Sequence, residues 1–355
     1  MSRARLHLFI AKNVYFPLNL DILIRFCTAP PLFHTKELHR MFYRFGIILL
    51  CLLLLGACGE TKTTGKLQKV GLLVPETVND QVWGTKGYKG MLKIQSKFNV
   101  DVFYKEGMIS QAVVERAVAE FQQKGVNLIF GHGSEYAEYF NNISKDYPEI
   151  HFVSFNGDAK NPNTTSLNFK AHAMGFFGGM VAAHMSKTNK VGVLAAYEWQ
   201  PEIEGFYQGA LAENKQTSIS IEYVGNWDDE KKAIQLANQM LESGVDVVYP
   251  AGDGFNVPVI EQVKGQGAYV IGYVSDQSDL GGSTVLTSTI QQVDTLYEKV
   301  AEQYNVEKLQ SGNLSFDFQD NVISLGKFSP LVSKEFIGKM NKHIEKYKET
   351  GKLPK

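Results

Sequence analysis

Short apolar segments alternate with amphipathic segments along most of the chain from residue 67 onward. The apolar segments are rich in valine, isoleucine and leucine, which is typical of buried strands. The segments between them carry apolar residues at helical spacing. We expect helices at residues 81–97, 110–124, 134–146, 202–214, 228–243 and 255–266. Strands that alternate with helices in this way predict a parallel sheet covered by helices on both faces.

The same pattern occurs twice, which indicates two lobes. KVGLLV at 69–74 is matched by KVGVLA at 190–195, which begins 121 residues later. GVNLIFGHG at 125–133 is matched by GVDVVYPAG at 244–252, which begins 119 residues later. One large sheet does not explain so constant an offset. The sequence therefore predicts an α/β fold with two doubly wound, Rossmann-like lobes and a hinge between them.

The remaining segments suggest how the chain passes between the lobes. We expect lobe 1 at 67–170, lobe 2 at 171–290, and a return to lobe 1 with a closing helix at 291–355. Within these ranges we expect helices at 171–185, 291–311 and 332–349 and a further strand at 321–327. Gly175, Gly178 and Gly179 are interpreted as close packing of a helix on a sheet, because no strand and turn precede them as a dinucleotide site requires.

An unbroken apolar stretch at 45–55 precedes the first strand and leads into LGAC at 55–58. It is too short to span a bilayer as a helix, but it fits the central part of a secretory signal. LGAC resembles the lipobox of bacterial lipoproteins, which implies that Cys58 carries lipid and begins the mature chain. Residues 41–57 are then the signal peptide, 58–66 a polar tether, and 1–40 an extension translated from a start codon placed too early. This predicts a lipid-anchored protein on the extracytoplasmic face of the cell membrane.

Composition argues against two classes of function, thiol chemistry and nucleic-acid binding. Cys27 and Cys51 precede the mature chain and Cys58 carries lipid, so neither a disulfide nor thiol chemistry is expected. Residues 1–57 hold seven of the 36 basic and two of the 37 acidic residues, which leaves 29 and 35 and a net charge near −6. The mature chain is therefore acidic and lacks the excess of basic residues that nucleic-acid-binding proteins carry, so direct DNA binding is disfavoured.

The sequence indicates a binding protein rather than an enzyme, with no cofactor or metal. It contains no H-E-x-x-H, G-x-S-x-G or P-loop motif, and His132 and Ser134 in GHGSE are interpreted as turn residues. Ligands of open α/β sheets bind beyond the carboxyl ends of the strands. The three tryptophans, Trp83, Trp199 and Trp227, fall in or beside those loops. Their indoles can stack on a planar ligand or pack beneath their own loops.

Several motifs, taken in chain order, resemble the basic membrane protein family of purine-nucleoside-receptor-like solute-binding lipoproteins. They are KVGLLVP (69–75), FVSFNGD (152–158), YVGNWDD (223–229), GVDVVYPAGDG (244–254), IGYVSDQ (271–277) and VLTSTIQQVD (285–294). The resemblance begins at residue 67 and extends almost to the end of the chain. It implies a fold of the type I periplasmic-binding-protein kind, whose interlobe cleft binds a nucleoside and delivers it to an ABC importer.

The resemblance and the loop positions together indicate the ligand-binding residues. These are Asn79, Asp80, Trp83, Asn156, Trp227, Asp228, Gly252, Asp276 and Gln291. Trp83 follows the first strand of lobe 1 and Trp227 follows the second strand of lobe 2. We expect the two indoles to face each other across the cleft and to sandwich a planar heterocycle, with Asn79, Asp228 and Asp276 supplying polar contacts.

Three departures from the family pattern weaken the case for a nucleoside. The aspartate that opens the first loop is replaced near Glu76, the first aspartate of G-V-D-x-D-Q is Val274, and the lysine after the T-S strand is Gln291. In the family these groups hold the ribose hydroxyls, and each lost bond of this kind costs about 1.5–3 kcal/mol.

Two functions therefore remain open. Within the family, the chain most resembles positive regulators of competence gene expression, which would have kept the fold and modified the cleft. The alternative is the substrate-binding component of an ABC permease for nucleosides or a related heterocyclic solute.

Overall fold

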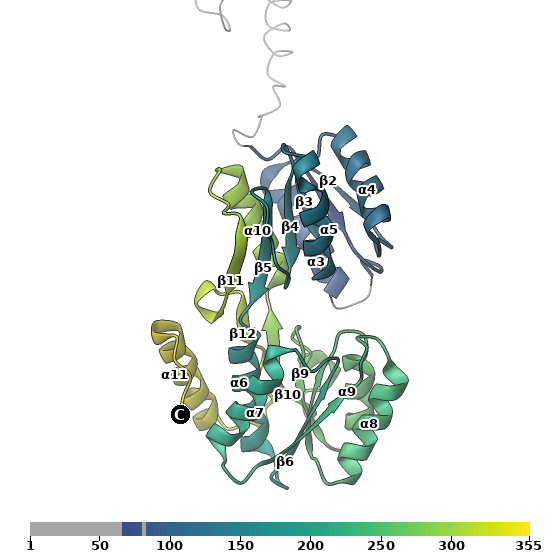
Figure 1. Ribbon diagram of the computed structural model, residues 1–355. Helices are drawn as coiled ribbons and strands as arrows, with labels where there is room; N and C mark the ends of the chain where they lie inside the picture. The colour runs from purple at the N-terminus through teal and green to yellow at the C-terminus, as the bar shows by residue number, and fades with distance from the viewer. Residues whose placement is uncertain (1–65, 80–82) are drawn as a thin grey trace, which may run out of the picture. The chain divides into compact units, whose positions relative to one another are not determined.

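The structure is a computed structural model that describes residues 66–79 and 83–355. Within these ranges the chain forms two lobes, each built on a six-stranded sheet (Figure 1). The proposed signal peptide, Cys58 and Asp80 lie outside the described residues. None of the described helices combines the length and apolar character that crossing a membrane requires.

The first lobe has the strand order β11-β5-β4-β3-β1-β2, and every pair is parallel. Its strands are β1 (Lys69–Leu73), β2 (Asp101–Lys105), β3 (Leu128–Gly131), β4 (His151–Phe155), β5 (Thr164–Phe169) and β11 (Gly312–Phe316). Helices α3 (Trp83–Phe98) and α10 (Val293–Asn305) pack on one face. Helices α4 (Gln111–Gln123) and α5 (Glu135–Ile143) pack on the other, and a short 3₁₀ turn, η1 (Ser144–Asp146), follows α5. Both faces are therefore buried, as the continuous apolar strands predict.

The second lobe repeats this arrangement with the order β12-β10-β9-β8-β6-β7. Its strands are β6 (Lys190–Ala195), β7 (Ser218–Tyr223), β8 (Val247–Ala251), β9 (Tyr269–Gly272), β10 (Val285–Gln291) and β12 (Ile323–Leu325). Only β12 runs antiparallel to its neighbour in this sheet. Helices α6 (Ala171–Met185) and α7 (Pro201–Glu213) cover one face, and α8 (Glu230–Glu242) and α9 (Asn256–Gly265) cover the other.

The described chain crosses between the lobes three times. It passes from β5 into α6, from β10 into α10, and from β11 through the 3₁₀ turn η3 (Phe318–Asp320) into β12. Helix α11 (Lys334–Thr350) then packs beside η3 and α6, where Tyr347 contacts Phe177 and Phe318 edge to face. Three adjacent crossovers form the hinge between the lobes, and the predicted fold class is confirmed.

The element predictions fail mainly around the third crossover. The helix expected at 291–311 ends at Asn305, and the segment after it forms β11, which the sequence pattern did not indicate. β11 pairs with β5, the other strand that was not predicted. Both are short and mixed in polarity, so their pairing depends on contacts between distant parts of the chain.

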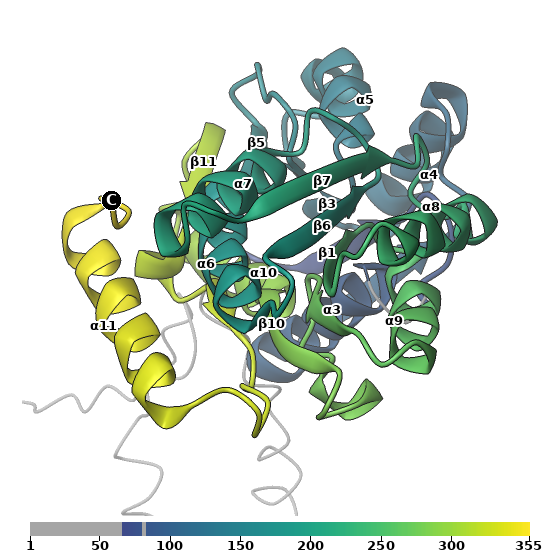
Figure 2. The same cartoon turned by 90° about the horizontal axis from the view of Figure 1, so that it is seen from below.

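The glycines of α6 pack mainly against a helix, which corrects the expected packing on a sheet. A methyl group built on Gly175 would lie 2.0 Å from the carbonyl oxygen of Glu202, and one on Gly179 would lie 2.1 Å from that of Phe206. Only Gly178 faces strand residues, with Thr289 and Ile271 as its neighbours. Figure 2 shows α6 and α7 side by side beside the strands of the second lobe. The missing side chains let the two helix backbones touch.

Candidate functional site: a cavity between the lobes

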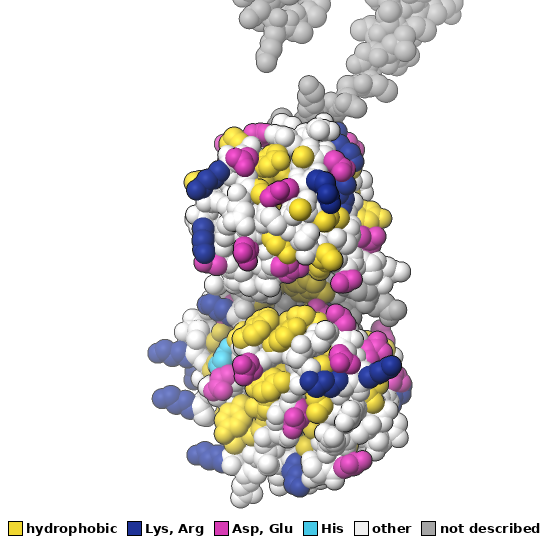
Figure 3. All heavy atoms as spheres, turned by 45° about the vertical axis from the view of Figure 1, so that its right-hand side comes forward, with side chains coloured by type: hydrophobic (Ala, Val, Ile, Leu, Met, Phe, Trp, Pro, Cys, Tyr) yellow, Lys and Arg dark blue, Asp and Glu magenta, His cyan; other side chains and the backbone are white. Residues whose placement is uncertain are grey.

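A cavity of about 420 Å³ lies between the lobes. Its walls come from loops at the carboxyl ends of the strands of both sheets, which is where open α/β folds place their ligands. In the view of Figure 3, hydrophobic and acidic side chains lie on both sides of the hollow between the lobes. The volume suits a small organic molecule.

Trp83 brings an indole to the first-lobe wall from the first turn of α3. One face of the indole stacks on the His132 ring, with 4.5 Å between ring centroids and 14° between planes. Its Nε1–H donates to the carbonyl oxygen of His132 at 3.2 Å, while His132 Nε2 is 2.7 Å from the carbonyl oxygen of Trp83. The hydroxyl of Tyr297 lies 2.9 Å from His132 Nδ1. His132 is therefore a fixed support for the indole.

Trp227 reaches the same cavity from the second lobe, together with Trp199. Trp199 stacks on Tyr197 at 5.6 Å and meets Trp227 edge to face at 5.9 Å. Trp199 is 62% exposed, an unusual exposure for so large an apolar side chain. The structure thus brings Trp83 and Trp227 to one cavity, and the sandwich of a ligand between them stays a prediction.

A buried carboxyl group lies in the second-lobe wall. Glu202, in the first turn of α7, is only 4% exposed and lines the cavity. Its Oε1 accepts hydrogen bonds from Gln200 Nε2 at 2.8 Å and from the Tyr273 hydroxyl at 2.9 Å. Burial raises the pKa of the Glu202 carboxyl, although bonds from its own backbone, Gln200 and Tyr273 oppose the shift. The donors hold the carboxyl in one orientation at the cavity wall.

All three positions that depart from the family pattern line the cavity: Glu76 is exposed, whereas Val274 and Gln291 are buried. Val274 is 2% exposed and has a φ of 62°, a left-handed value that is strained for a β-branched residue. The Ser275 N–H donates to the carbonyl oxygen of Tyr273 at 2.6 Å, which closes a tight turn around Val274. Gln291 is buried, and its backbone N–H donates to the carbonyl oxygen of Val274 at 3.0 Å. Strain of this kind concentrates at functional sites.

The eight predicted binding residues that the structure describes divide into two groups. Trp83, Asn156, Trp227, Asp228 and Gln291 line the cavity.

Asn79, Gly252 and Asp276 are not among the described lining residues. Asp276 instead accepts hydrogen bonds from the backbone N–H groups of Ser278 and Lys327, at 3.1 and 3.2 Å. Gly252 lies against the Phe255 ring, where a methyl group would come within 2.0 Å of it. The backbone N–H of exposed Asn79 donates to Thr77 Oγ1.

Several lining residues were not predicted individually. They include His132, Glu135, Glu202, Asp253 and Tyr273, whereas Trp199 was placed among the loop aromatics. Most of them lie in loops that the sequence analysis placed at the carboxyl ends of strands. Their position could therefore be predicted from the sequence, although their role in the cavity could not. Glu202 in particular resembles an ordinary acidic residue in the first turn of a helix.

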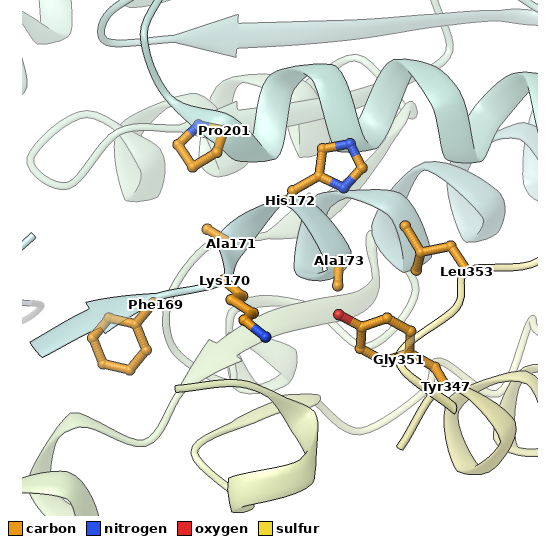
Figure 4. Close-up of a pocket in the computed structure, with 9 residues that line it drawn as sticks. All are labelled: Phe169, Lys170, Ala171, His172, Ala173, Pro201, Tyr347, Gly351 and Leu353. Carbon is orange, nitrogen blue, oxygen red and sulfur yellow. The ribbon is translucent and has the colours of Figure 1, made fainter. Parts of the chain in front are cut away.

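A second cavity of about 380 Å³ lies beside the first crossover (Figure 4). It shares Phe169, Ala171 and Pro201 with the interlobe cavity. In Figure 4 the Lys170 ammonium and the Tyr347 hydroxyl point toward the same space. Both contact the buried carboxylate of Asp317, Lys170 at 3.8 Å and Tyr347 at 2.7 Å. These contacts tie α11 to the hinge.

Comparison with known proteins agrees with this geometry. The chain is 54% identical over 315 residues to the "Transcriptional activator protein med" of Bacillus subtilis, covering 89% of this chain and 99% of that protein. It is 25% identical to the "ABC transporter nucleoside-binding protein BmpA" of Lactococcus lactis, covering 76% of this chain and 84% of that protein.

A crystal structure of "a Transcriptional Activator of comK gene" from Bacillus halodurans has 52% identity and a TM-score of 0.77. The match covers 81% of this chain and 100% of that one. The sequence profile described as "ABC transporter substrate-binding protein PnrA-like" matches residues 67–355. This chain therefore belongs to the family of PnrA-like substrate-binding proteins, the basic membrane protein family.

Proposed function

We propose that this chain is a lipid-anchored, non-catalytic regulator that senses a small solute in its interlobe cavity and promotes competence gene expression. The observation that carries the proposal is the altered cavity. Val274 and Gln291 stand where the resemblance implies an aspartate and a lysine, and both line the cavity. The names of the Bacillus subtilis and Bacillus halodurans proteins supply the regulatory role.

The hinge offers a route from binding to regulation. A ligand that touches both walls stabilises the closed arrangement of the lobes, because it has differential contacts with the open and closed states. Closure changes the surface that the protein presents to a partner in the membrane. With an anchor at Cys58 on the outer face, the chain would act through such a partner and not by direct contact with DNA.

Removing two indoles tests this proposal. In a Bacillus strain that lacks its own homologue, we expect Trp83→Ala/Trp227→Ala to lose most activation of a competence-gene reporter. Each lost aromatic face removes about 1–3 kcal/mol of stacking, so the paired change weakens ligand binding by tenfold or more. Reporter activity is measured at matched protein abundance.

Tyr223→Ala is the matched control, since Tyr223 is an exposed aromatic residue that is not among the described lining residues. It should activate as the wild type does. Full activation by the double variant would show that regulation does not use the cavity.

The second candidate is the substrate-binding component of an ABC importer. The description of the family and the name of the Lactococcus lactis relative favour it. Calorimetric titration with adenosine, guanosine and free bases separates the two roles, because nucleoside capture below about 1 μM needs the charged contacts that Val274 and Gln291 do not supply. Adjacent ATPase and permease genes would also favour import.

A further inference from the structure

The charged side chains that the structure describes in the lining of the interlobe cavity are all acidic. Five described carboxylates line it, two from the first lobe and three from the second: Glu76, Glu135, Glu202, Asp228 and Asp253. Among the described lining residues there is neither lysine nor arginine. A solute that enters the cavity therefore meets a negative potential from both walls.

An ammonium group that contacts a lining residue from outside the cavity is engaged at the hinge. Lys86 Nζ donates to the backbone carbonyl oxygen of Gln291 at 3.0 Å and is not among the lining residues. Burial lowers the pKa of Lys86 to about 8, while the nearby charges of Asp294 and Asp253 oppose the shift. One ammonium does not balance five carboxylates.

Aromatic rings complete the lining. Trp83, Trp199, Trp227 and Tyr273 all border the cavity, and indole faces are the strongest cation-π partners among side chains. An acidic cavity with aromatic walls disfavours anions and leaves a neutral solute without compensation for the buried carboxyl group of Glu202. It matches a ligand that carries positive charge on an organic body.

Glu202 supplies a fixed anchor for that charge. Hydrogen bonds from Gln200 and Tyr273 fix the position of its carboxyl group. Helix α6 packs closely against this turn, since a methyl group built on Gly175 would come within 2.0 Å of the Glu202 carbonyl oxygen. Burial also raises the pKa of the Glu202 and Glu135 carboxyl groups, and a nearby cation would relieve this destabilisation of the ionised form.

We propose that the interlobe cavity binds a small organic ammonium ion, with Glu202, Asp228 and Asp253 facing the positive charge and the indoles packing against its organic body. The inference rests on the proposed function in taking this cavity as the solute site. It goes beyond it in naming the ligand class, which differs from the neutral nucleosides that the family resemblance implies.

Two pairs of probes of the same shape test the inference. Choline is compared with 3,3-dimethyl-1-butanol, and benzylammonium with benzyl alcohol, by calorimetric titration of the purified protein near pH 7. Within each pair only the positive charge differs appreciably. We expect at least one cation to bind about tenfold or more tightly than its neutral partner.

Variants of the cavity carboxylates then show where the positive charge of the probe binds. Glu202→Gln and Asp253→Asn should each weaken cation binding by about tenfold and leave the affinity for the neutral partner nearly unchanged. Glu345→Gln is the control, because Glu345 is exposed on α11 and pairs with Lys348, away from the cavity. Asp253→Asn keeps the test valid if the buried Glu202 variant does not fold.

Three results would overturn the inference. They are equal affinity for cation and alcohol, unchanged cation binding in both cavity variants, or no binding of either cation up to about 10 mM. In the last case, saturable binding of a nucleoside in the same calorimeter would refute the ligand class and leave the solute-binding role standing. An active reporter in the Trp83→Ala/Trp227→Ala variant would instead refute the proposed function.

Discussion

Gly209→Ala should lower the free energy of unfolding by about 3 kcal/mol, near the upper end of what overpacking costs. A methyl group at this position would lie 1.9 Å from the carbonyl oxygen of Phe176 on the facing helix. Backbone atoms cannot rotate aside as a side chain can, so α6 and α7 must separate. Gly205, one turn earlier on α7, has the same relation to the carbonyl oxygen of His172, also at 1.9 Å.

Urea denaturation of the purified protein measures the effect, and Gly338→Ala supplies the control. Gly338 lies within α11, and a methyl group there meets nothing within 4 Å. Alanine should therefore stabilise that helix by about 0.5–1 kcal/mol. If Gly209→Ala were as stable as the wild type, the close contact of the two helices would be wrong.

Cys58→Ser should abolish lipid attachment and leave the precursor unprocessed. The thiol is the only group in LGAC that can carry a thioether-linked lipid, and without the lipid the short apolar stretch at 45–55 cannot replace a spanning helix. Labelled palmitate should enter the wild type and not this variant. Cell fractionation should show loss of stable membrane association.

Cys51→Ser is the matched control, because Cys51 lies within the expected signal peptide and ends up outside the mature chain. It should be processed, labelled and anchored normally. A Cys58→Ser protein of mature size that remains fully bound to the membrane would refute the lipid anchor and, with it, the proposed extracytoplasmic location.

The fold was largely predictable because both sheets are buried on two faces. Strands such as β1 and β6 read as continuous apolar runs, and α6 was predicted with its observed bounds, Ala171–Met185. β11 was missed because it is short and mixed in polarity and its partner β5 is far away in sequence. Gly175 and Gly179 were identified as packing residues, but their partners depend on the fold that brings α7 beside α6.

The candidate site was predictable in position and only partly in composition. The rule that ligands bind beyond the carboxyl ends of strands led to Trp83, Trp227 and Asp228, which line one cavity. Asp276 shows the limit of a family motif, because in this chain its carboxylate accepts backbone hydrogen bonds within the second lobe. The acidic lining became visible only when loops from both lobes were brought together.

The central claim is that a small solute binds between the two lobes. The chain contains three tryptophans, and all three line this cavity, so their fluorescence reports on its occupancy without a label. The direct measurement is tryptophan emission during titration with nucleosides, free bases and the two ammonium probes. We predict a saturable change with one solute bound per chain, which Trp83→Ala/Trp227→Ala removes. Calorimetric one-to-one binding that leaves the emission unchanged, or no binding by any member of the panel, would contradict the claim.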